Sequence, residues 1–323
     1  MKIGNLEISG EFFLAPMEAV NCASFRLLCE KRGAAIVYTD MIDADHFVEY
    51  LNETNEEETI AKYINLQGEK LAIQLGGRNI DNLVKTMNVL EKHALFFDFN
   101  AGCPLPYMLG KKGGVYLMKH PDQLYKIITE LRAATSKPFT VKLRSGWDKD
   151  SINALEIAKN LEEIGVDAIA IHARTRKQKY EQKSDWNLVR EMKKELDIPI
   201  ILSGDVFNAY LAKKAFQHTK CDFIMIGRAA KNNPSIFIDL QSYNDTLDLP
   251  ERIYDKKTAY VKADFKEFLE LYKTKENRYK FSEIRDHSLW FAKDCRNNKE
   301  ITQKIMSAET EEDLQRIFET IQF

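Results

Sequence analysis

The chain has 323 residues, of which 44% are hydrophobic and 30% charged, with a formal net charge of −2. This ordinary globular composition excludes collagen-like, coiled-coil and wholly disordered classes, and near neutrality means that any polyanion must be bound by a local patch. No apolar run of about 18 residues predicts a membrane span, and the N-terminus lacks a signal-peptide core. Five cysteines without a Cys-x-x-Cys pair predict neither a disulfide scaffold nor a structural metal site, and they favour a cytoplasmic location.

Eight short β-rich segments alternate with helical patterns between residue 11 and about residue 240. Most are continuous apolar runs rich in Ile, Val and Phe, which are typical of strands buried on both faces of a parallel sheet. Helical patterns begin at Asn79, Pro121, Ser151 and Asn208, residue types that favour helix starts. The predicted strands are 11–17, 35–41, 70–77, 95–102, 139–146, 168–174, 198–206 and 222–228.

This alternation predicts a closed (β/α)8 TIM barrel over residues 1–241. A doubly wound sheet is the alternative, and it requires a glycine-rich phosphate loop after its first strand. The segment LAPMEAVNCAS, which follows that strand, contains no glycine and favours the barrel. Strand signals stop after about residue 240, and apolar residues recur at helical spacing over 255–273 and 301–322. We therefore expect an all-helical C-terminal domain over residues 242–323.

Polar residues and glycines mark the C-terminal ends of seven of the eight predicted strands, and the first strand ends in a Pro-Met turn. In a barrel these ends share one rim, where active sites are built. Gly204 and Gly227, after the last two strands, let backbone amides approach a phosphate, and Arg228 adds a fork of donors. Strand termination alone would explain either glycine equally well. The whole pattern predicts a site with a phosphate-binding half.

Lys142 and Cys103 have the most suggestive chemistry at this rim. Lys142 interrupts an apolar strand, so we expect its ammonium group to enter the mouth and stabilise an anionic reduced ring system. Cys103 follows a strand in Asn-Ala-Gly-Cys-Pro, where an exposed thiol can donate a proton or act as a nucleophile. Burial as a small hydrophobe is the usual alternative for a cysteine. His172 alone favours a buried structural histidine, and Gln74 can bind a heterocycle edge or cap a strand end.

Basic residues cluster on loops at the same rim. The segment 174–183 carries five positive charges against one negative, and Lys111, Lys112 and Arg144 add to it. Cations contact phosphates and aromatic rings stack on splayed bases, so these loops predict a folded RNA as partner. The mixed basic and aromatic segment 251–300 is, by itself, better explained as a solvated surface.

Distinctive motifs lie at 14–17, 38–41, 74–77, 100–104 with 113–114 downstream, 140–147, 172–175, 204–206 and 226–229, followed by Arg285, His287, Trp290 and Phe291 in the predicted helical domain. Taken together, these motifs resemble the tRNA-dihydrouridine synthases, and the last four residues resemble the helical-domain signature of that family. The resemblance implies an FMN-containing barrel, reduced by NADPH or NADH, and a helical domain that binds tRNA. The implied reaction reduces the 5,6 double bond of specific uridines to dihydrouridine.

The resemblance also implies roles for individual residues. The flavin N5 gives hydride to C6 of the uracil and Cys103 protonates C5, so the pKa of that thiol should not be strongly lowered. The residues expected to bind FMN are Pro16, Met17, Glu18, Gln74, Lys142, His172, Ser203, Gly204, Asp205, Gly227 and Arg228. Those expected to contact tRNA are Asn100, Lys111, Lys112, Arg144, Arg174, Arg176, Lys177, Arg285 and His287.

Two positions depart from the usual family pattern. Ser203 stands where asparagine is usual, which could weaken one flavin contact, and Glu18 begins an unusual continuation of the Pro-Met turn. Three alternatives remain: a flavin barrel that reduces free pyrimidines or small enones, a non-catalytic RNA-binding module, and a phosphate-binding lyase without flavin. We expect a monomer.

Overall fold

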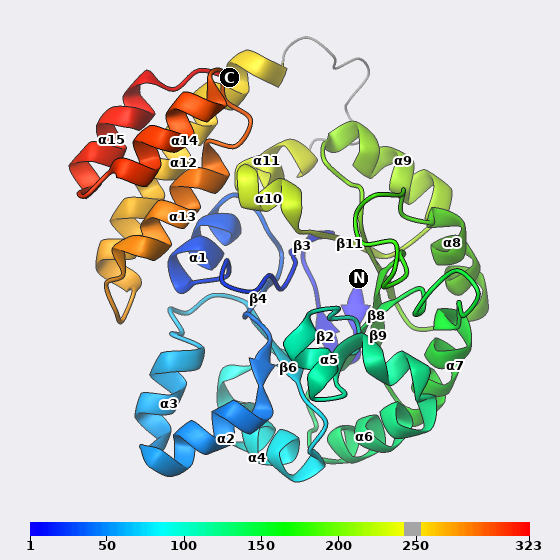
Figure 1. Cartoon of the computed structure of the whole chain (residues 1–323). Coiled ribbons are helices and arrows are strands. Elements are labelled where there is room, and N and C mark those ends of the chain that lie inside the picture. The colour runs from blue at the N-terminus through cyan, green and yellow to red at the C-terminus, as the bar shows by residue number, and fades with distance from the viewer. Residues whose placement is uncertain (242–252) are drawn as a thin grey trace.

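The structure is a computed structural model that describes residues 1–241 and 253–323. The predicted start of the helical domain, residue 242, lies outside the described residues, so that boundary stays a prediction. Figure 1 shows a barrel of strands ringed by helices, with a further group of helices against one side. Among the described residues, no helix is both long enough and apolar enough to cross a bilayer.

Eight parallel strands form the barrel, and each lies within the segment predicted for it. Their order is β3, β11, β10, β9, β8, β7, β6, β4, and a bridge between Phe13 and Ile36 joins the two ends of this series. The predicted TIM barrel is confirmed. The barrel strands are β3 (Phe12–Leu14), β4 (Val37–Tyr38), β6 (Leu71–Gly76), β7 (Phe96–Asn100), β8 (Phe139–Arg144), β9 (Ala168–His172), β10 (Ile200–Ser203) and β11 (Phe223–Ile226); β5 (Ile42–Asp43) also pairs with β6, and β1 (Lys2–Ile3) and β2 (Leu6–Glu7) form a separate hairpin.

Helices cover the outside of the barrel (Figure 1). Local sequence starts three of them as predicted: the Asn79 and Asn208 side chains accept backbone N–H bonds, and Pro121 opens its helix. The helices of this part are α1 (Ala23–Lys31), α2 (Ala44–Glu53), α3 (Glu56–Tyr63), α4 (Ile80–Leu90), α5 (Pro106–Gly110), α6 (Pro121–Ala133), α7 (Ala154–Ile164), α8 (Trp186–Glu195), α9 (Ala209–Thr219), α10 (Arg228–Asn232) and α11 (Ile236–Gln241), with short 3₁₀ turns at Glu91–His93 and Gly114–Lys119.

One predicted helix start is wrong, because α7 begins at Ala154 and not at Ser151. The Ser151 hydroxyl donates to the Asp148 carboxylate at 2.7 Å, and Ile152 forms an antiparallel bridge with Gly146. A serine side chain can satisfy a turn as readily as a helix start, and here the turn prevails.

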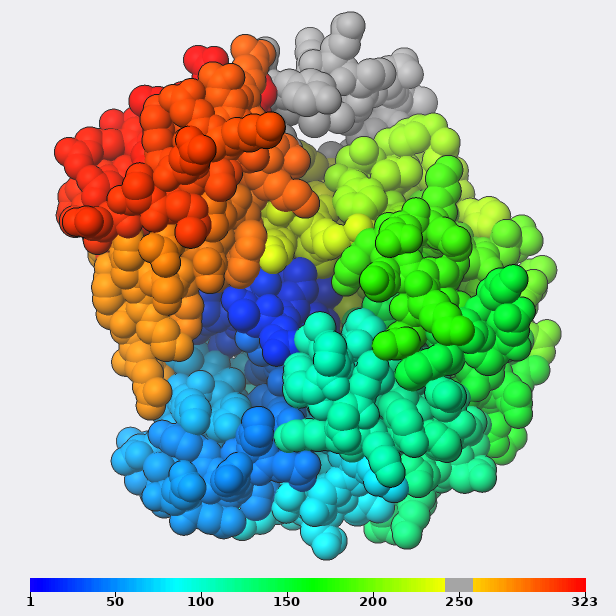
Figure 2. Space-filling model, in the orientation of Figure 1, coloured from blue at the N-terminus to red at the C-terminus, as the bar shows by residue number. Residues whose placement is uncertain are grey.

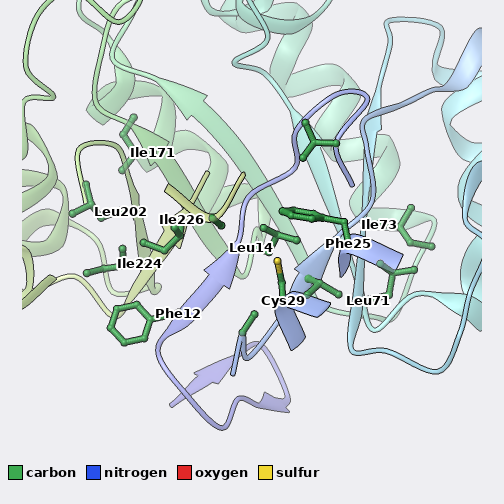
Figure 3. Packing of buried hydrophobic residues seen from close by; sticks show 14 of the residues in the cluster. Phe12, Leu14, Phe25, Cys29, Leu71, Ile73, Ile171, Leu202, Ile224 and Ile226 are labelled. Atoms are coloured by element: carbon green, nitrogen blue, oxygen red, sulfur yellow. The ribbon is translucent and has the colours of Figure 1, made fainter. Parts of the chain in front are cut away.

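Apolar side chains form two layers, because successive residues of a strand face opposite sides of the sheet. The outer layer lies between strands and helices, and Figure 3 shows Leu14 beside Phe25 and Cys29 of α1. The inner layer fills the lower barrel, where the rings of Phe13 and Phe223 stack with centroids 4.7 Å apart. Residues at the β1–β2 hairpin join this inner layer. The filled lower barrel leaves the opposite end to form a site.

The described part of the C-terminal region is all helical, as predicted. Its longest helix buries an apolar face that includes Val261, Phe265, Phe268 and Leu269, and the Phe265 ring stacks on Phe318. Burial of each such side chain stabilises the fold by roughly 1.5–3 kcal/mol. The helices are α12 (Ile253–Lys275), α13 (Phe281–Phe291), α14 (Asn298–Ser307) and α15 (Glu311–Thr320).

This helical region is attached to the barrel by specific polar contacts with α1. The Ser24 backbone N–H and hydroxyl both donate to Glu276 at 2.7 Å, which caps α1 from the helical side. Arg32 donates to Asp264 at 2.8 Å, and that carboxylate is fully buried. A buried carboxylate requires such partners, so the contact defines how the two parts meet.

Candidate active site

The C-terminal end of the barrel brings predicted rim residues to one face of the sheet. Asn100 of β7 pairs in register with Lys142 of β8, and His172 of β9 pairs with Arg144 and with Ser203 of β10. Paired residues of neighbouring strands share a face, and residues two apart on a strand do so as well, so these side chains lie on one face at two successive levels. Figure 2 shows this face, with the segments after β3 (blue), β7 (teal) and β9 (green) meeting near its centre.

One pocket at this mouth is lined by nine of the eleven residues predicted to bind the cofactor. Gly204 has a φ of +119°, and a Cβ there would lie 2.8 Å from Ser184 Oγ. Glycine is therefore needed at this wall for conformation and for space. Gln74 and Glu18 lie outside the pocket lining, whereas the nine inside it are Pro16, Met17, Lys142, His172, Ser203, Gly204, Asp205, Gly227 and Arg228.

The pocket has an excess of positive charge at its β9–β11 side. Arg174 donates two bonds of 2.7 Å to the Asp205 carboxylate, and Arg228 donates a third at 3.2 Å. Two guanidinium groups thus share one carboxylate. Burial, reinforced by the nearby cations, holds the pKa of His172 well below its ordinary value, so this ring is neutral. The charge excess and the glycine wall fit the phosphate end of the expected cofactor.

Lys142 is a half-buried cation in the same pocket. Burial, with a smaller contribution from Arg144, lowers its pKa to about 8, and Asp98 opposes this shift. The amine is still largely protonated at neutral pH. Because Pro16 and Met17 line the same pocket, apolar surface and positive charge lie together there. That combination fits a planar ring that carries electron density.

Cys103 is half-buried on the loop that follows β7. Asn100 Oδ1 accepts the backbone N–H groups of Gly102 at 3.0 Å and Cys103 at 2.7 Å, which holds this loop. Gly114 packs against it so closely that a Cβ would lie 2.5 Å from Cys103 O. Burial raises the pKa of the Cys103 thiol, and Glu18 raises it further. The thiol therefore keeps its proton at neutral pH, as a proton donor must.

Comparison with known proteins agrees with this geometry. The family model for dihydrouridine synthase (Dus) matches residues 13–322. The chain belongs to the dihydrouridine synthase family. The tRNA-dihydrouridine synthase B of Pasteurella multocida is 32% identical over 79% of this chain and 77% of its own length. The same-named protein of Klebsiella pneumoniae is 31% identical over 77% of each chain.

A third relative in the dihydrouridine synthase family comes from Rickettsia conorii. This probable tRNA-dihydrouridine synthase is 33% identical over 76% of this chain and 74% of its own. Among solved structures, the Amycolatopsis orientalis BexX/CysO complex matches with 14% identity and a TM-score of 0.48, over 77% of this chain and 97% of that chain. A likeness that distant does not bear on function.

Some basic residues predicted to contact tRNA lie exposed at the mouth of this family member. Lys112 is exposed on the loop after α5, and Lys177 is exposed beside Asp148, 2.8 Å away. Lys111 is half-buried and paired with Asp43 at 2.6 Å. Arg176 lies over the Trp147 ring, 4.5 Å from its centroid. These loops thus present cations and one aromatic ring around the pocket.

Other residues of the predicted tRNA set are buried and bound to the protein itself. Arg144 donates to Gly102 O at 2.9 Å, and Arg174 is bound to Asp205. His287 Nε2 lies 3.1 Å from Val20 O, and its ring stacks on Phe268. Arg285, on α13, is half-buried. The structure brings Arg144 and Arg174 to the mouth, whereas Arg285 and His287 belong to the helical region.

Sequence reasoning missed several groups around this site. Asp98 is fully buried in β7, two residues before Asn100 and on the same face. Strand alternation alone could have found it. Tyr180 stacks near His172, with centroids 6.0 Å apart, and lies over Arg228 at 4.4 Å. The sequence places Tyr180 on a basic rim loop but gives no signal that its ring lies against His172 and Arg228.

Proposed function

We propose that this chain is an FMN-dependent reductase that converts uridines of tRNA to dihydrouridine, with NADPH or NADH as electron donor. Family membership and the names of the relatives support the reaction. The observation that carries the proposal is the position of Asn100. It pairs in register with Lys142 and holds the amide of Cys103, so the cation and the thiol belong to one mouth.

In this proposal the nine pocket residues would hold FMN, with Gly204, Gly227 and Arg228 binding its phosphate. FMN, when bound and reduced, would supply the hydride for C6 of the uracil. Lys142 would place its positive charge where negative charge must be tolerated. Gln74, which is buried outside the pocket lining, bonds to Asn100 and would support this wall from behind. Residues 1–241 form the catalytic domain and residues 242–323 the tRNA-binding domain.

The protein's own acid chemistry is assigned to Cys103. Its thiol donates the proton that C5 of the uracil requires, because its raised pKa keeps it protonated. Asn100 holds the backbone on which the thiol is mounted. The uridine must leave its stack to reach this depth, which favours a flexible tRNA loop over a duplex.

Around this mouth, exposed Lys112 and Lys177 are assigned to tRNA phosphates. Half-buried Lys111 and Arg176 lie on the same loops and add charge to that surface. Exposed Tyr180 is a candidate platform for a splayed base. The buried members of the tRNA set, including Arg174 and His287, serve this surface by holding its supporting loops.

The test is reduction of unmodified tRNA by the purified protein with NADPH or NADH. Flavin absorbance is expected in the protein as purified, and dihydrouridine is expected in the tRNA product by mass spectrometry. Free uridine is the matched substrate control and should react far more slowly. Equal rates on the two substrates would support the small-substrate alternative. A colourless protein that binds tRNA without reducing it would support the non-catalytic alternative.

A further inference from the structure

A buried carboxylate beneath the mouth has no role in the chemistry proposed above. Asp98 lies inside the barrel, in register with Gln74 of β6 on one side and Thr140 of β8 on the other. It accepts a hydrogen bond from Thr140 Oγ1 at 2.5 Å and from Gln74 Nε2 at 2.7 Å. A fully buried carboxyl group is costly to keep, so its retention in a catalytic barrel calls for a reason.

Asp98 begins a continuous chain of hydrogen bonds that ends at the catalytic loop. Gln74 Oε1 accepts from Asn100 Nδ2 at 2.7 Å. Asn100 Oδ1 in turn accepts the backbone N–H groups of Gly102 and Cys103. Three successive hydrogen bonds thus connect Asp98 to the backbone of Cys103, the residue assigned as proton donor.

The negative charge of Asp98 sets the donor-to-acceptor direction of these hydrogen bonds. An ionised carboxylate only accepts, whereas each amide side chain has a donor end and an acceptor end that can exchange by rotation. Burial raises the pKa of Asp98 to about 6, held down by Thr140, Gln74 and Lys142, so the carboxylate is ionised at neutral pH. Gln74 must then direct its NH₂ group toward Asp98 and its oxygen toward Asn100.

We propose that Asp98 is a positioning residue, which through Gln74 and Asn100 sets the hydrogen-bond direction that holds the Cys103 loop. The inference rests on the proposed function, because it is the proton donor on that loop that gains from being held. Gln74 is oriented by the same bond, so its amide oxygen is held toward Asn100. Asp98 itself does not line the pocket.

Two substitutions separate an acceptor role from bulk packing. Asp98→Val removes the acceptor and leaves Gln74 free to rotate. Asp98→Asn keeps an oxygen toward Gln74 and turns its NH₂ toward the Thr140 hydroxyl, which can accept. We therefore expect Asp98→Asn to retain most of the function that Asp98→Val loses.

The first measurement is hydrogen–deuterium exchange at the amides of Gly102 and Cys103 in the protein as purified, without tRNA or nucleotide. Asp98→Val should speed exchange there about tenfold, the scale of one weakened hydrogen bond, while Asp98→Asn stays near wild type. Asp264→Val is the matched control, since it removes an equally buried carboxylate at the helical interface. It should leave exchange at these two amides unchanged.

The second measurement is the kinetics of tRNA reduction. Asp98→Val should lower kcat about tenfold, as expected for a displaced reacting group, with little change in KM for tRNA. If Asp98→Val does not fold, Asp98→Ser replaces it, because the serine hydroxyl is too short to reach Gln74. The exchange contrast stands even if the wild type reduces no tRNA, so failure of the proposed function is distinguishable from failure of this inference.

Three outcomes would overturn the positioning role. Exchange rates and a kcat equal to those of the wild type in Asp98→Val would show that the hydrogen bonds of Asn100 to the Cys103 loop form without the carboxylate. Equal losses in Asp98→Asn and Asp98→Val would assign the effect to charge and not to the acceptor. Faster exchange at Cys103 in the Asp264→Val control would mean that the loop responds to general loosening.

Discussion

The barrel mouth and the helical region both bury polar residues, but these residues have different roles in the two regions. At the mouth, Lys142 and His172 face a pocket, and burial shifts the pKa of each away from its ordinary value. In the helical region, burial also raises the pKa of Asp264 and lowers that of His287, but these two side chains face another element and are bound to it. A buried polar group beside a cavity is available for chemistry, whereas one beside a neighbouring helix maintains architecture.

The two regions nevertheless meet at the segment that follows β3. Pro16 and Met17 line the pocket, and Val20, three residues later, lies against His287. Glu276 holds the start of α1 only a few residues further on. The helical region therefore supports the wall of the site as well as extending the surface beside it.

The largest effect should come from the thiol at the mouth. Cys103→Ala should keep flavin absorbance but lower tRNA reduction about 1000-fold, within the range for a missing general acid. Cys295→Ala, a buried thiol of the helical region, is the matched control and should leave the rate unchanged. A full-rate Cys103→Ala protein would remove the acid assignment.

The next largest effect should come from the mouth cation. Lys142→Met should slow reduction about 100-fold, the scale for one electrostatic donor. Because the pKa of Lys142 is lowered to about 8, its positive charge is present below that pH and is lost as pH rises through it. The rate of the wild type, followed by stopped-flow absorbance, should fall over the same interval. A rate that stays level from pH 7 to 10 would contradict this role.

A substitution in the helical region should lower the free energy of unfolding and leave the reaction rate unchanged. Asp264→Asn weakens the contact with Arg32, which keeps Glu267 as a partner at 2.7 Å. We expect a loss of about 2 kcal/mol in the free energy of unfolding, measured with urea, as for a hydrogen bond to a charged group. Glu195→Gln, at an exposed ion pair with Lys159, is the control and should not alter stability. A slower rate in folded Asp264→Asn would blur the distinction between the regions.

The smallest effect should come from single cations at the surface. Lys112→Gln should weaken tRNA binding a few-fold and reduce the slope of log affinity against log salt by about 0.9, one phosphate contact. The salt dependence of tRNA affinity in Arg285→Gln tests the helical region in the same way. Unequal slopes would show which region carries the phosphate contacts, and an unchanged slope for both would count against a phosphate-binding rim.

Much of the fold could be predicted because its signals are local. Continuous apolar runs marked most of the eight barrel strands, and Asn79, Pro121 and Asn208 marked helix starts. Ser151 also predicts a helix start, but it lies in a turn, because its hydroxyl donates a hydrogen bond to Asp148. The type of a residue determines which hydrogen bonds it can form, and the surrounding residues determine which of them it does form.

The candidate site was predicted unevenly for a related reason. Cys103 and Lys142 stood out because each is unusual in its segment. Asp98 did not, although it shares a face with Asn100, because its partners come from strands distant in the sequence. Charge likewise drew attention to Arg174, whose partner Asp205 lies on another loop.

The succession of strand and helix segments, the glycines after β10 and β11 and the residue types at each strand end could all be predicted from the sequence. Those properties depend on periodicity and backbone freedom, which neighbouring residues set. Tertiary contacts were needed to show which charges are satisfied inside the protein and which remain at the surface. That depends on the three-dimensional proximity of residues from different strands, and burial then makes each pairing strong enough to shift a pKa or to hold a loop.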